Sequence, residues 1–136
     1  MTEPNLTIPT ELVVTFPDGL PGFEACQQFL LYSKPETLPI RCLHAVEGPR
    51  ASFLAIQTDE ALEGYRHQLS GPDRLRLQVE DESHLLWLAV VTVDEEGPVT
   101  ANLRAPIVIN VAKQLGYQIM PHQCVYPLRH PLAQAA

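Results

Sequence analysis

The segment VTANLRAPIVINVAKQLGYQIMPHQCVYPLRHPL, residues 99–132, decides the fold of this chain. It contains two short apolar runs, residues 99–103 and 107–111, which Pro106 separates. Runs of this length that are rich in β-branched side chains predict strands. A proline between them is typical of a turn or a sheet edge, because proline has no donor for the hydrogen-bond ladder. Residues 117–120 predict a further strand, so this end of the chain is expected to be β-structure.

Asn102 and Asn110 each lie within one of these apolar contexts. A buried side-chain amide that lacks hydrogen bonds costs roughly 1 to 3 kcal/mol. We therefore predict that each asparagine ties down a neighbouring loop or bulge.

Short apolar runs separated by turns also fill the preceding part of the chain. Apolar and polar residues alternate over residues 75–79, which predicts a strand with one exposed face. Residues 59–70 repeat apolar side chains at spacings of three and four, which predicts the one short helix, ended by Gly71 and Pro72. Further strands are predicted at residues 12–16, 29–32, 43–46, 52–56 and 85–93.

These elements predict an all-β, mainly antiparallel fold, a compact β-barrel-like single domain with one short helix around residues 59–70. The 13 prolines argue against a helical bundle, because proline inside a helix removes a donor and clashes with the preceding turn. The domain is expected to span residues 1–132, and residues 133–136 are expected to be a frayed tail.

The amino-acid composition limits the classes of protein to which this chain can belong. Hydrophobic residues make up 46% of the chain and charged residues 18%, which suits a folded, soluble protein. No apolar run approaches the roughly 20 residues of a membrane-spanning helix, and the amino terminus lacks the basic and apolar order of a secretory signal. The three cysteines are an odd set without a Cys-x-x-Cys pair. We therefore expect a cytoplasmic protein with reduced thiols.

The formal net charge of −7 argues against direct binding of nucleic acid, which requires a basic surface. The acids collect in short groups, of which Asp94, Glu95 and Glu96 form one. Such groups either form solvated loops or attract a basic partner toward the surface by long-range electrostatics. The sequence leaves both interpretations open.

Residues that could carry catalysis or hold a metal are sparse. His122, Cys124 and His130 lie near one another in the sequence, but a zinc site needs three or four convergent ligands. Ser83 and His84 are adjacent, so they would face opposite sides of a strand, and no nucleophile elbow or phosphate-binding loop is present. We predict no catalytic residue, no metal ligand and no cofactor.

Two separated motifs of the sequence carry a family resemblance. The first lies near the amino terminus and comprises Phe16, Pro17, Gly19, Leu20, Pro21, Gly22, Phe23 and Glu24. The second lies within the segment quoted above and comprises Thr100, Asn102, Leu103, Ala105, Pro106, Ile107, Val108, Ile109 and Asn110. Together, and in this order, they resemble the family of flagellar assembly factors called FliW. Residues Gln118, Tyr126, Arg129, His130, Pro131 and Leu132 are similar to the end of the family pattern.

This resemblance implies a small barrel-like protein without catalytic activity that binds other proteins. Its implied partners are flagellin and CsrA, a basic, dimeric, RNA-binding translational repressor. In the circuit of the family, flagellin holds FliW until secretion depletes it, and freed FliW then binds CsrA and relieves repression of flagellin synthesis. We further expect a monomer in the cytoplasm, and the net charge and the short apolar runs predict that it binds neither nucleic acid nor membranes.

For contact with these partners we single out Glu47, Asp94, Glu95 and Glu96 as steering charges. Asn102, Asn110 and Tyr126 are expected to fix the shape of the surface. Three alternatives remain: a barrel that binds a small molecule or a metal through His122, Cys124 and His130, a self-associating structural subunit, and a diverged FliW-like protein with a different partner. The last draws on His44 and Ala45, which replace a Gln-Ser pair of the family.

Overall fold

The computed structural model describes residues 11–20, 22–47, 51–58, 69–93, 99–120 and 126–132. Within these residues the chain forms mostly strands with three short helical segments. The strands are β1 (Glu11–Thr15), β2 (Gln28–Ser33), β3 (Ile40–Ala45), β4 (Ser52–Gln57), β5 (Leu85–Val93), β6 (Val99–Ala101), β7 (Ile107–Asn110), β8 (Leu115–Gln118) and β9 (His130–Pro131). The helical segments are η1 (Pro35–Thr37), α2 (Gly71–Arg76) and η2 (Glu82–His84).

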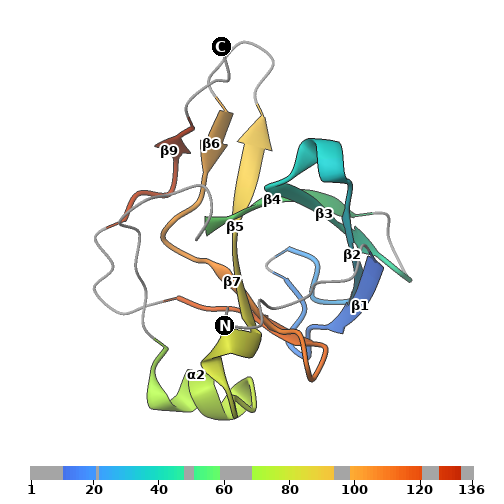
Figure 1. Cartoon of the computed structure of the whole chain (residues 1–136), viewed down its shortest axis with the longest axis vertical. Helices are drawn as coiled ribbons and strands as arrows, with labels where there is room; N and C mark the ends of the chain where they lie inside the picture. Colours follow the sequence, from blue (N-terminus) through green and yellow to red (C-terminus); the bar gives the residue numbers. More distant parts are fainter. Residues whose placement is uncertain are drawn as a thin grey trace, which may run out of the picture.

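The strands form one sheet that closes on itself (Figure 1). Their order is β4-β3-β2-β1-β8-β7-β5, and β5 pairs back onto β4 to complete the barrel. The long strand β5 makes this closure, because its first half pairs with β7 while its second half pairs with β4 and β6. β6 and β9 extend the sheet beyond the barrel. The predicted all-β barrel is therefore confirmed.

One seam of the barrel differs from the others. β1 and β8 run parallel and share a single register pair, Thr15 with Leu115, whereas all other pairings are antiparallel. The side chain of Gln114 supports this seam, because its Nε2 donates to the carbonyl oxygen of Val13 at 2.9 Å. Gly116 is required beside it, since a Cβ atom there would lie 2.7 Å from the ring of Phe16.

The interior of the barrel is filled by inward-facing apolar residues of β1, β2, β3, β5 and β7. Phe16 and Phe29 meet edge to face, with ring centroids 5.6 Å apart. The other fully buried members of this cluster include Val14, Leu31, Leu43, Leu88, Ile107 and Ile109. Alternate residues of the same strands therefore point outward.

The predicted strand at residues 75–79 is wrong, because α2 occupies its first two residues. The hydroxyl of Ser70 caps this helix by accepting from the backbone N–H of Asp73 at 3.2 Å, and Pro72 lies in the first turn, where its missing N–H costs nothing. The Gly71-Pro72 pair, expected to end a helix, thus begins one. Residues 59–68 of the predicted helix lie outside the described residues, as does the predicted tail.

Residues that flank α2 cover the outer face of β5, β7 and β8, which we call the covered side. Leu77 follows α2, is fully buried, and packs with Leu85, Val108 and Ile119. In Figure 1, α2 lies beside the first part of β5 and away from β2 and β3. None of the helices in the described ranges is long and apolar enough to cross a membrane.

Candidate functional site

The predicted steering charges are only partly described. Asp94, Glu95 and Glu96 lie outside the described residues. Glu47 is exposed just beyond the end of β3 and lines a polar hollow of about 340 Å³ together with Thr15, Ala25, Cys26, Gln27 and Gln28.

Asn110 is 2% exposed and holds two parts of the chain together. Its Nδ2 donates to the carbonyl oxygens of Leu77 at 2.9 Å and Gln78 at 3.2 Å, which lie just beyond α2. Its Oδ1 accepts from the backbone N–H of Lys113 at 3.3 Å. The amide thus ties the end of α2 to the turn between β7 and β8, as predicted from its apolar context.

Asn102 fixes the turn between β6 and β7. Its Oδ1 accepts from the backbone N–H groups of Arg104 at 3.0 Å and Ala105 at 3.2 Å. Its own backbone N–H donates to the carbonyl oxygen of Val90 at 2.9 Å, which anchors the turn to β5. The loop-fixing prediction is confirmed for this residue too, and these bonds occupy its side-chain oxygen within the fold.

Tyr126 is half-buried and packs against a smaller cluster on β4, β5 and β6 that includes Ile56, Ala89 and Leu103. Its carbonyl oxygen accepts from Nε of Arg104 at 3.2 Å. Arg104 therefore brings Asn102 and Tyr126 to one corner of the molecule. Glu47 at the end of β3 and Asn110 at the end of β7 lie on other elements.

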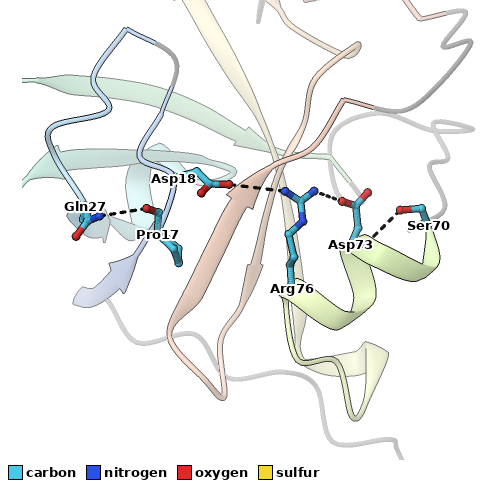
Figure 2. A network of polar contacts seen from close by, with 6 residues as sticks. All are labelled: Pro17, Asp18, Gln27, Ser70, Asp73 and Arg76. Atoms are coloured by element: carbon cyan, nitrogen blue, oxygen red, sulfur yellow. Dashed lines mark hydrogen bonds and ion pairs between the residues drawn. The ribbon is translucent and has the colours of Figure 1, made fainter.

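Ion pairs tie the charges of the covered side to one another. Arg76 bonds to Asp73 within α2, and its Nη1 lies 3.7 Å from Oδ2 of Asp18 in the loop after β1 (Figure 2). The hydrogen bond to Asp73 raises the pKa of the Arg76 guanidinium, which also lies 5.1 Å from the ring centroid of Tyr117. α2 is thereby linked to β8 and to the loop that follows β1.

Two further pairs fix the segment between α2 and β5. Nη1 of Arg74 lies 3.2 Å from Glu82, and Nζ of Lys113 lies 3.0 Å from Glu80. The hydrogen bond and positive charge of Lys113 lower the pKa of Glu80. The carboxylates of Glu80 and Glu82 are therefore paired with cationic side chains of this chain.

The outer face of β1, β2, β3 and β4 is different, and we call it the open face. Its residues follow the strand register: Val13 is opposite Leu30, Tyr32 is opposite Cys42, and Cys42 is opposite Leu54. Val13 and Leu54 are each 39% exposed, and the residues between them are half-buried. A hollow of about 320 Å³ opens here, lined by Tyr32, Lys34, Ile40, Cys42, His44 and Leu54.

Sequence reasoning missed the open face, although one signal for it exists. The run Phe29-Leu30-Leu31-Tyr32 is apolar at consecutive positions. Successive residues of a strand point to opposite faces, so such a run is apolar on both sides of the sheet. Phe29 and Leu31 fill the barrel, and Leu30 and Tyr32 therefore emerge on its outside.

The metal-binding alternative is not resolved by the described residues. They contain no group of three or more His, Cys, Asp or Glu side chains placed to hold a metal ion. His130 is half-buried in β9, whereas His122 and Cys124 lie outside the described residues.

Comparison with known proteins identifies relatives along nearly the whole chain. The family model described as "FliW protein" matches residues 3–132. The flagellar assembly factor FliW of Clostridium botulinum (strain Alaska E43 / Type E3) is 33% identical over 122 residues, which cover 89% of this chain and 86% of that protein. The flagellar assembly factor FliW of Thermosipho africanus (strain TCF52B) is 35% identical over 124 residues, with coverage of 90% and 86%.

The fold agrees with this match. A crystal structure of the flagellar assembly factor FliW superimposes with a TM-score of 0.81 at 34% identity, covering 90% of this chain and 86% of that one. The family match over residues 3–132 includes β1 to β9, and the shared fold covers 90% of the chain. The chain therefore belongs to the FliW family of flagellar assembly factors.

Proposed function

We propose that this chain is a non-enzymatic, cytoplasmic regulator that binds flagellin and a CsrA-type translational repressor, and so relieves repression of flagellin synthesis. The observation that carries the proposal is the family match over residues 3–132. Relatives at 33% and 35% identity are named flagellar assembly factors. We further propose that residues 1–132 form one monomeric domain.

The arrangement of polar groups supports a binding role. The side-chain oxygens of Asn102 and Asn110 accept hydrogen bonds that shape turns, so we assign both residues to holding the surface in place. Glu47 is exposed and suits long-range attraction of a basic partner, as the net charge of −7 does. Asp94, Glu95 and Glu96 are proposed to act in the same way, and Tyr126 to shape the corner around Arg104.

Calorimetric titration tests the proposal directly. The purified protein is titrated with the CsrA-type regulator and, separately, with the flagellin of the same organism. We expect saturable binding of each, and we expect flagellin to reduce the binding of the regulator. Failure to bind either protein at tens of micromolar would reject the proposed function.

A translation assay tests the consequence of binding. A flagellin reporter repressed by the CsrA-type regulator should recover when this protein is added, and excess flagellin should restore repression. Reversal of Asp94, Glu95 and Glu96 to Lys should slow association with the regulator. An unchanged association rate would remove these three acids from the proposal.

A further inference from the structure

We propose that the open face of β1, β2, β3 and β4 is a docking surface for a segment of a partner protein that presents apolar side chains flanked by Lys or Arg. This inference rests on the proposed function, since it assigns the surface through which a protein partner binds. Three features support the proposal: the exposed apolar side chains of the open face, the contrast with the covered side, and the charges around the open face.

The apolar surface crosses four strands in two adjacent register rows, one of which ends in the polar His44 and Ser52 and the other in Glu11. Side chains directly opposite in antiparallel strands have Cβ atoms about 4.5 to 5.5 Å apart, so the register places Val13 against Leu30 and Cys42 between Tyr32 and Leu54. Contiguous exposed apolar surface of this kind marks interaction sites more often than isolated apolar residues do. The hollow beside Tyr32 and Cys42 offers a place for an apolar side chain of the partner.

On the covered side, the chain itself shields outward-facing apolar side chains from water. There, Trp87, Val108 and Tyr117 also face outward from the barrel, and Leu77 and its neighbours bury Val108 and partly cover the two aromatic side chains. On the open face, Val13 and Leu54 each keep 39% of their surface exposed. A partner that covers the open face would remove this apolar surface from water, as Leu69, Leu77 and Val79, which flank α2, do on the covered side.

Charge complementarity indicates the chemistry of the occupant. Glu11 is opposite Tyr32, on the same face of the sheet, and Glu36 and Glu47 lie in the segments that follow β2 and β3. In the described structure none of these three carboxylates takes part in an ion pair. Lys34 lies 5.9 Å from the ring centroid of Tyr32 and is the only exposed Lys or Arg in the described residues from 11 to 58.

The same charges disfavour a second copy of this chain as the occupant. A two-fold dimer through the open face would bring the same patch of both copies together, including Glu11 of each. Each copy also carries a formal net charge of −7, which opposes association. A basic and apolar partner segment meets no such repulsion.

The test compares a variant of the open face with a matched variant elsewhere. Val13→Thr combined with Leu54→Thr makes the face more polar and places at both positions a β-branched residue, which suits a strand. Leu75→Gln combined with Met120→Gln is the control, because these side chains are 80% and 71% exposed and lie outside the open face. Circular dichroism and thermal unfolding establish that both variants fold like the unmodified protein.

Calorimetry with whichever partner binds the unmodified protein gives the first readout. We expect the open-face variant to bind at least about tenfold more weakly, and the control variant to bind within about twofold of the unmodified protein. Equal affinity of both variants would overturn the docking surface while leaving the proposed function intact. Failure of the unmodified protein to bind either partner would reject the proposed function and, with it, this surface.

Alkylation of Cys42 supplies a second readout that requires no substitution. Mass spectrometry follows modification of this half-buried thiol in the unmodified protein, with and without bound partner. We expect saturating partner to slow the modification at least about fivefold, because the partner covers Cys42. An unchanged rate at saturation would overturn the proposal even if the open-face variant failed to fold.

Discussion

Two sides of the barrel carry outward-facing apolar residues, and the described residues cover these two sides to different extents. On the covered side, Leu77 and other residues that flank α2 cover most of the outward apolar side chains of β5, β7 and β8. The charges there are ion-paired, as Arg74 with Glu82 and Lys113 with Glu80. On the open face the apolar residues remain exposed and the surrounding carboxylates are unpaired within the described structure.

The difference separates folding from binding. Apolar surface that the chain covers with its own residues contributes to stability, whereas apolar surface that stays exposed contributes only when another molecule covers it. Substitutions on the covered side should therefore change the free energy of unfolding. Those on the open face should change the free energy of binding.

The largest expected effect on stability is that of Leu77→Ala. Leu77 is fully buried, so its truncation should lower the free energy of unfolding by about 2 to 5 kcal/mol. Leu75→Ala is the matched control two residues earlier, because Leu75 is 80% exposed and should change stability by about 0.5 kcal/mol or less. Urea denaturation measures both, and equal losses would mean that Leu77 does not cover the barrel as described.

The next effect tests the tie between α2 and the barrel. Asn110→Ala should cost about 1 to 3 kcal/mol, because the carbonyl groups of Leu77 and Gln78 would lose a donor at a buried site. Asn102→Ala should cost less, since its amide accepts from two N–H groups in a turn where it is only half-buried. A larger loss for Asn102→Ala than for Asn110→Ala would contradict this assignment.

Much of this comparison could not be predicted from the sequence, and α2 shows why. The alternation of Leu75, Leu77 and Val79 is compatible with a strand, but the Ser70 cap and Pro72 favour a helix start. Local periodicity cannot decide between these two choices. The contact of Leu77 with β5 and β7 is made between residues distant in the sequence.

The strands were predicted more accurately, because a run of apolar residues directly reflects the burial of the strand that it forms. β1, β2, β4 and β7 lie within one residue of the expected boundaries, and the roles of Asn102 and Asn110 in fixing loops are as predicted. β9 was not predicted, since two residues show no periodicity. The open face was not predicted, because which face of a strand another element covers depends on contacts between residues distant in the sequence.

Charge reversal at and around the open face tests whether the surrounding carboxylates attract the partner. Glu11→Lys combined with Glu47→Lys should slow association severalfold and make it less dependent on salt, because the attraction is electrostatic and screened by ions. Glu80→Lys combined with Glu82→Lys changes the net charge equally but on the covered side. Stopped-flow measurements compare the two, and equal slowing would show that only the net charge matters.

The smallest effect concerns the ion pair of Lys113 with Glu80, which strengthens the attachment of the covered side. Lys113 lowers the pKa of Glu80 below its ordinary value of 4.5, so the folded state favours the ionised carboxylate. This contribution to stability is complete above pH 4.5 and is lost as the pH falls through the lowered folded-state pKa. Lys113→Met should therefore reduce the melting temperature slightly at pH 7 and make it less sensitive to acid below pH 4.5.

Glu80→Gln should have the same effect, and combining the two substitutions should add little, since both remove the same interaction. Strictly additive changes would show that the two residues stabilise the fold through separate contacts.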